Sequence, residues 1–76
     1  MKKHQGRVSR FGPQGYGFIT DSQSRTQYFV HIKDVIGRKE LRAGDIVEFE
    51  EGPQNPDKAP NAINVEFLGE TVEVLS

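Results

Sequence analysis

Two short segments with alternating side chains, separated by a polar turn, constrain this sequence more than any other feature. In "YGFIT" (residues 16–20) and "QYFVHI" (residues 27–32), side chains alternate with the period of two that is typical of a β-strand. The intervening "DSQSRT" is rich in turn-forming residues, so the two segments are expected to pair as an antiparallel hairpin.

Three further segments have the composition and spacing of strands. The first covers residues 5–11 and ends at the turn sequence "GPQG"; the others are "DIVEFE" at residues 45–50 and "AINVEF" at residues 62–67. Alternation predicts an inner face for each of the last two strands. The inward residues are expected to be Val47 and Phe49 in one strand and Ile63, Val65 and Phe67 in the other.

Five short strands without a convincing helix predict an all-β fold, a small antiparallel barrel. Closure is favoured because an open five-stranded sheet would leave one apolar face uncovered. Gly37 interrupts the helical composition of residues 33–44, so we expect at most a short helical turn there. Residues 1–76 are expected to form one domain, with a core over 5–67 and a tail over 68–76 that has the alternation of an extra strand.

Charge is distributed unevenly along the chain. Residues 1–44 contain nine Lys or Arg against three acidic residues, whereas residues 45–76 contain a single Lys against eight acidic residues. If the basic half forms one face, a polyanion can bind there although the net charge is −1. The alternative is that both sets are scattered, solubilising charges.

Several classes of function find no support in the sequence. The chain has no Cys and two His, and we expect His4 to lie in a frayed N-terminus, which leaves His31 without a second metal ligand. "GYGFIT" has Thr20 where a nucleotide-binding G-x-G-x-x-G motif needs its third glycine. No apolar run is long enough to cross a membrane. We therefore expect no enzyme, no metal and no cofactor, and the cytoplasm as the default location.

The hairpin should carry an unusual number of rings on its outer face. Alternation sends Ile19, Tyr28, Val30 and Ile32 into the barrel and gathers four rings outside, those of Tyr16, Phe18, Phe29 and His31. Soluble monomers rarely expose such an apolar patch without a function. Nucleobases stack on exposed rings, at roughly 1–3 kcal/mol per base. The alternative is that the rings cover one another as cross-strand pairs, and that Gly15 and Gly17 serve the hairpin rather than the approach of a ligand.

These segments resemble the cold shock domain family. "GYGFI" at residues 15–19 and "YFVHI" at 28–32 are similar to the family's two ribonucleoprotein motifs, and "GRVSRF", "LRAGDIVEFEEGP" and "PNAINV" extend the resemblance. The resemblance implies a five-stranded antiparallel OB-type barrel that binds single-stranded RNA or DNA by base stacking, as an RNA chaperone. It implies binding by Phe11, Tyr16, Phe18, Phe29 and His31. We add Arg7 and Arg10, which lie beside the rings in the predicted sheet.

The sequence departs from the family at the rim of this face. Arg10 stands where family members usually have Trp, and Gln14 stands where they usually have Lys. Strict alternation would also send Arg10 inward with Val8, so we expect a local irregularity that turns Arg10 outward. Binding is therefore expected to be weaker, shorter in footprint and more dependent on salt than in typical members.

A second reading of the same features remains open. The barrel could serve as a protein-interaction or dimerisation module that has lost most nucleic-acid binding. We expect a monomer, with a dimer formed through residues 68–76 or by strand exchange as the alternative.

Overall fold

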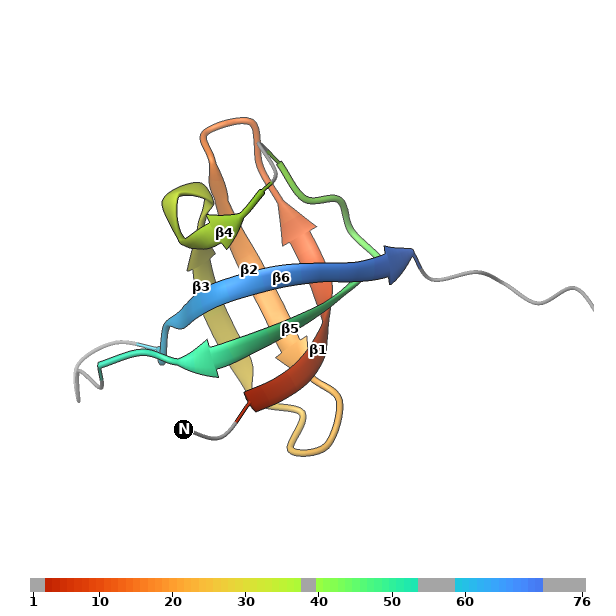
Figure 1. Ribbon diagram of the computed structural model, residues 1–76, viewed down its shortest axis with the longest axis vertical. Helices are drawn as coiled ribbons and strands as arrows, with labels where there is room; N and C mark the ends of the chain where they lie inside the picture. The colour runs from red at the N-terminus through yellow and green to blue at the C-terminus, as the bar shows by residue number, and fades with distance from the viewer. Residues whose placement is uncertain (1–2, 38–39, 54–58, 71–76) are drawn as a thin grey trace, which may run out of the picture.

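The computed structural model describes residues 3–37, 40–53 and 59–70 of the chain (Figure 1). In this part of the chain, the regular elements are strands and one short 3-10 helix. In order they are β1 (Lys3–Phe11), β2 (Tyr16–Asp21), β3 (Gln27–His31), η1 (Ile32–Asp34), β4 (Val35–Ile36), β5 (Asp45–Glu51) and β6 (Ala62–Glu70).

The predicted all-β fold is confirmed, and all five predicted strands are present as β1, β2, β3, β5 and β6. The short helical turn expected after the hairpin is η1. The predicted number of five strands is one too low, because β4 pairs in parallel with β6 and adds a sixth strand to the sheet. A strand of two residues is too short for alternation to reveal it in the sequence.

The six strands form one curled sheet in the order β3-β2-β1-β5-β6-β4. Strand β1 joins the two halves, because its C-terminal part pairs with β2 and its N-terminal part pairs with β5. Figure 1 shows β5 and β6 crossing in front of the β1–β2–β3 meander. The curl brings β3 against the start of β6, where the N–H of Phe29 donates to the carbonyl of Pro60 at 2.8 Å. The result is the OB-type barrel architecture.

The core lies between the meander and the β5–β6 pair. Its fully buried side chains come from both layers, because alternation turns every second residue of each strand inward. The largest are Val8, Ile19 and Val30 from the meander and Val47, Phe49 and Val65 from β5 and β6. Tyr28, Val35, Leu41 and Ala62 complete the cluster, with Phe11 and Ile32 packed against it.

The predicted inner face of β6 is only partly right. Asn64 adopts a left-handed backbone conformation with φ of 50°, and the register with β5 shifts there. This bulge breaks the alternation, so Ala62 and Val65 are buried while Ile63 is only half-buried. A left-handed Asn is uncommon but tolerated, and nothing in "AINVEF" marks it in advance.

The prediction that His4 lies in a frayed terminus is wrong. Strand β1 begins at Lys3, and its first residues pair with β5. The His4 ring stacks on Phe49, with ring centroids 5.5 Å apart, and its Nδ1 lies 2.8 Å from Oδ2 of Asp21. Pairing with β5 and the side-chain contacts of His4 thus hold the beginning of β1 in place.

The C-terminal tail was expected to supply an extra strand. Residues 68–70 instead continue β6, which pairs with β5 as far as Glu70. The rest of the predicted tail strand, residues 71–76, lies outside the described residues.

Candidate functional site

The register of the β2–β3 hairpin places four rings on one outer face. Tyr16 pairs with His31, and Phe18 pairs with Phe29, so the side chains of both pairs lie on the same side of the sheet. The ring centroids of Tyr16 and Phe29 are 5.7 Å apart, and those of Phe18 and Phe29 are 5.9 Å apart in an edge-to-face arrangement. We call Tyr16, Phe18, Phe29 and His31 the aromatic face. Tyr16 is exposed and the other three side chains are half-buried.

A bulge in β1 brings Arg10 to this face. Val8 pairs with Ile19, but the next pair is Arg10 with Phe18, so Ser9 is an extra residue in β1. Without the bulge, Arg10 would share the inner face with the buried Val8. The predicted irregularity is therefore confirmed. The Cζ atom of Arg10 lies 5.4 Å from the centroid of the Phe18 ring, a cation–π contact in which the guanidinium covers part of the ring.

Close packing of β1 against β2 requires a glycine at position 17. This differs from the role in ligand approach that the sequence also allowed. A Cβ at Gly17 would overlap the carbonyl oxygen of Arg10 and would lie 2.7 Å from the Cα of Phe11. The two strands approach so closely beside the bulge that only glycine fits there. Gly15 has φ of +91°, which the hairpin turn requires. Both glycines therefore belong to the hairpin, the alternative reading of the sequence.

Phe11 lies at the edge of the site rather than on the aromatic face. It is half-buried and packs against the core, opposite Gly17. It also lines a surface pocket of about 320 Å³ together with Arg10, Gln14, Tyr16 and Phe18. Most of the surface of this pocket is contributed by apolar atoms, so a flat, apolar group such as a nucleobase can enter it.

His31 has a structural contact as well as a place on the aromatic face. Its Nδ1 accepts a hydrogen bond of 3.1 Å from the backbone N–H of Lys33, which caps the N-terminus of η1. This bond fixes the orientation of the imidazole ring. The sequence did not indicate this capping contact, because it depends on a 3-10 turn that begins directly after β3.

Arg7 lies on the same face of the sheet, one row beyond Arg10 and Phe18. It pairs with Thr20, and its side chain is exposed. Ser9 and Thr20 stand between the two arginines, with their hydroxyl oxygens 2.6 Å apart. Sequence reasoning did not single out either hydroxyl. Alternation already places Thr20 beside the rings, but Ser9 reaches this surface only through the bulge.

The electrostatics of this face favour an anion. Among the described residues of β1, β2 and β3 that point outward around the rings, none is acidic. Asp21, at the end of β2, is buried, and its Oδ1 accepts hydrogen bonds from the backbone N–H groups of Gln23 and Ser24. Burial raises the pKa of Asp21, but hydrogen bonds from Ser24, Gln23 and His4 outweigh it and hold that pKa below its ordinary value. Asp21 is therefore a structural carboxylate of the turn.

The described part of the chain offers neither a metal centre nor a membrane-spanning helix. In residues 3–37, 40–53 and 59–70, no three His, Cys, Asp or Glu side chains gather in a way that could hold a metal ion. Over the same ranges, no helix is long and apolar enough to span a membrane.

Comparison with known proteins points to one family. The model of the "'Cold-shock' DNA-binding domain" matches residues 4–68. The cold shock-like protein CspC of Buchnera aphidicola subsp. Acyrthosiphon pisum is 41% identical over 68 residues, which span 86% of this chain and 96% of that protein. A cold shock-like protein of Aquifex aeolicus is 42% identical over 59 residues, covering 75% of this chain and 81% of that protein.

A solved structure agrees with the fold. The chain described as "drosophila Unr CSD456" superimposes with a TM-score of 0.68 at 24% sequence identity. The match covers 95% of this chain and 29% of that longer chain. At this identity the likeness concerns the fold alone.

Proposed function

The chain belongs to the cold-shock DNA-binding domain family, whose members bind nucleic acid, and from this premise we propose that it binds single-stranded RNA or DNA by base stacking. The observation that carries the proposal is the cluster of three rings on the outside of the β2–β3 hairpin, in which Phe29 contacts both Tyr16 and Phe18. Half-exposed rings offer flat faces to unpaired bases, and every base has a face that can stack on them.

In this proposal each predicted residue has a distinct part. Tyr16, Phe18, Phe29 and His31 form the stacking surface. Phe11 contributes the wall of the pocket beside Arg10 and Gln14. Arg10 and Arg7 contact phosphate groups, because a guanidinium donates to phosphate in a planar, two-pronged arrangement.

The biological role that fits this chemistry is that of an RNA chaperone. A protein that stacks unpaired bases competes with base pairing and keeps RNA segments open without hydrolysing a nucleotide. We propose that residues 1–76 act as one binding domain in the cytoplasm, as a monomer, without a catalytic reaction. Binding is weaker and more salt-dependent than in family members that carry Trp at the position of Arg10, because a charge replaces part of the stacking surface.

Replacement of both Phe18 and Phe29 by Ala tests the stacking surface. Each lost stacking contact costs roughly 1–3 kcal/mol, so affinity for labelled oligothymidine should fall about 30-fold or more in an anisotropy titration. The two rings lie outside the fully buried core, so circular dichroism should show a folded variant. A folded double variant with wild-type affinity would refute the proposed surface.

A matched control removes exposed apolar side chains from β4 and β6, which lie far from β2 and β3 in the sheet order. Ile36 in β4 and Leu68 in β6 are 52% and 51% exposed, more than any other large hydrophobic residue that the structure describes. Replacement of both by Ala removes exposed apolar surface of a similar kind, and we expect affinity for oligothymidine to stay unchanged.

The same two residues support the second candidate function, a protein-interaction or dimerisation module. Ile36 pairs with Glu66, two residues before Leu68, so both aliphatic side chains lie close to the β4 edge. Exposed aliphatic groups near a strand edge favour association with another chain. Light scattering over a range of protein concentrations separates the candidates. A dimer that the Ile36→Ala/Leu68→Ala variant abolishes, and that oligonucleotide does not affect, would support the module.

A further inference from the structure

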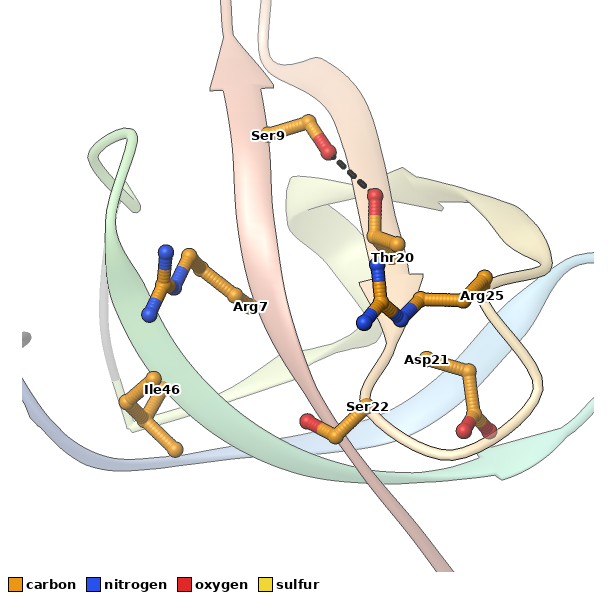
Figure 2. A pocket seen from close by; sticks show the side chains of 7 residues that line it. All are labelled: Arg7, Ser9, Thr20, Asp21, Ser22, Arg25 and Ile46. Carbon is orange, nitrogen blue, oxygen red and sulfur yellow. Dashed lines mark hydrogen bonds between the residues drawn. The ribbon is translucent and has the colours of Figure 1, made fainter.

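A second pocket lies directly beyond the aromatic face on the same side of the sheet. Its volume is about 480 Å³, and β1, β2 and the β2–β3 turn at residues 22–26 contribute to it. Figure 2 shows its lining, with Arg7 on β1 and Arg25 on the turn. The hydroxyl pair of Ser9 and Thr20 stands between this pocket and the row of Arg10 and Phe18. The surface therefore continues from the rings to the pocket without leaving the sheet.

The pocket carries two positive charges that are not neutralised within the described part of the chain. Neither Arg7 nor Arg25 forms an ion pair or a side-chain hydrogen bond with another described residue. Asp21 is the acidic residue of the lining, but its two oxygens bind His4 and the N–H groups of the turn. Figure 2 shows its carboxylate directed away from the guanidinium of Arg25. Two free guanidinium groups at one pocket favour a doubly contacted anion.

The backbone of Arg25 supplies an independent observation. Arg25 has φ of 63°, a left-handed conformation in which glycine is relaxed and a side chain is disfavoured. Hydrogen bonds of the turn hold it there, including the N–H of Arg25 to the carbonyl of Asp21 at 3.0 Å and the N–H of Asp21 to the carbonyl of Thr26 at 2.9 Å. Glycine would suit this turn better, so an arginine there points to a use for its side chain.

We propose that Arg7 and Arg25 bind a phosphodiester group of the nucleic-acid strand where it continues past the aromatic face. The inference rests on the proposed function, since it assigns the next part of the same strand. Guanidinium groups suit this ligand because their fixed N–H donors match the geometry of phosphate oxygens. The exposed Ser22 hydroxyl, at the lower rim in Figure 2, is available as a further donor.

Replacement of Arg25 by Gly separates binding from folding. The change removes one charge and one guanidinium and relaxes the left-handed residue, so the urea midpoint of the variant should equal or exceed that of the wild type. Affinity for a labelled 12-residue oligothymidine should fall about fivefold at 0.1 M salt, and the slope of log K against log salt should become about 0.7 less steep, the value for one phosphate contact on a single strand. Arg25→Asn, which also tolerates this conformation, should behave in the same way.

Arg42→Gln is the control for net charge. Arg42 is exposed in the loop before β5, lines neither pocket described above, and its replacement changes the net charge by the same amount. We expect its salt slope to match that of the wild type. If both Arg25 variants bind with wild-type affinity and slope, or if Arg42→Gln loses as much as they do, the phosphate pocket is refuted while the stacking surface stands. A wild-type protein that does not bind oligothymidine at all would refute the proposed function and this inference together.

Discussion

Gly17 should be the glycine of this chain that tolerates a side chain least. Its Cβ would overlap the Arg10 carbonyl oxygen and come within 2.7 Å of the Phe11 Cα, and both neighbours are backbone that no rotamer change can move. Strands β1 and β2 would have to separate beside the bulge. We estimate about 1–3 kcal/mol for the overpacking and about 0.5–1.5 kcal/mol for a ladder hydrogen bond that breaks. Gly17→Ala should therefore lower the free energy of unfolding by about 1.5–4.5 kcal/mol, a large part of the stability that a domain of this size has.

Gly69→Ala is the matched control for this prediction. Gly69 also lies in a strand, but a Cβ built there meets no atom within 4 Å, and its φ is not positive. Alanine at this site should leave stability unchanged or raise it by about 0.4–1 kcal/mol, because it restricts the unfolded chain. Urea unfolding followed by far-ultraviolet circular dichroism measures both variants. A destabilisation of Gly17→Ala by less than about 0.5 kcal/mol relative to Gly69→Ala would refute the argument that the close approach of β1 and β2 at the bulge requires glycine.

Two further predictions concern the turn and the rim of the site. Asp21→Asn should lower the free energy of unfolding by about 1–3 kcal/mol at neutral pH, because two backbone N–H groups and His4 lose their charged acceptor. The pKa of Asp21 in the folded state lies below its ordinary value of 3.8. The contribution of the Asp21 carboxylate to stability is therefore complete at pH above 3.8 and is lost as pH falls through the folded-state pKa. Urea midpoints at several pH values should thus show the wild type and the variant converging in acid; a constant difference would contradict this. Arg10→Trp should tighten binding to oligothymidine and make its salt slope about 0.7 less steep.

The strands and the aromatic face were predictable because they depend on a local rule. Alternation in residues 16–20 and 27–32 is enough to place Phe18 and Phe29 on one face once the two segments pair. The bulge in β1 was predictable for a related reason. Alternation alone put Arg10 on the inner face, and an arginine in so small a core is unfavourable without a partner, so the conflict itself indicated an irregularity.

Features that depend on the partner strand or on one backbone angle were not predictable. The bulge at Asn64 follows from the register with β5, and the place of His4 follows from the pairing of β1 with β5 and from the contact with Asp21. The composition of "DSQSRT" predicts the turn that contains Arg25. It does not predict the left-handed conformation of Arg25 or its place beside Arg7 at one pocket, because both depend on how the hairpin folds. The sequence left the role of Gly17 open between ligand access and the hairpin, because it shows a missing side chain without showing what occupies the space.

The contact of Arg10 with Phe18 explains why Arg10→Trp should raise affinity while it lowers the salt dependence of binding. The guanidinium lies 5.4 Å from the centre of the Phe18 ring, so a base that stacks on Phe18 must displace it or lie upon it. Displacement gives up a cation–π contact of about 0.5–1 kcal/mol at an exposed site, whereas a Trp would add a stacking surface of roughly 1–3 kcal/mol. The released arginine can contact phosphate, which adds affinity mainly at low salt. Affinities of the two proteins should therefore approach each other as salt is lowered. A Trp variant that binds more weakly than the wild type at high salt would show that Arg10 does not compete with the bases for Phe18.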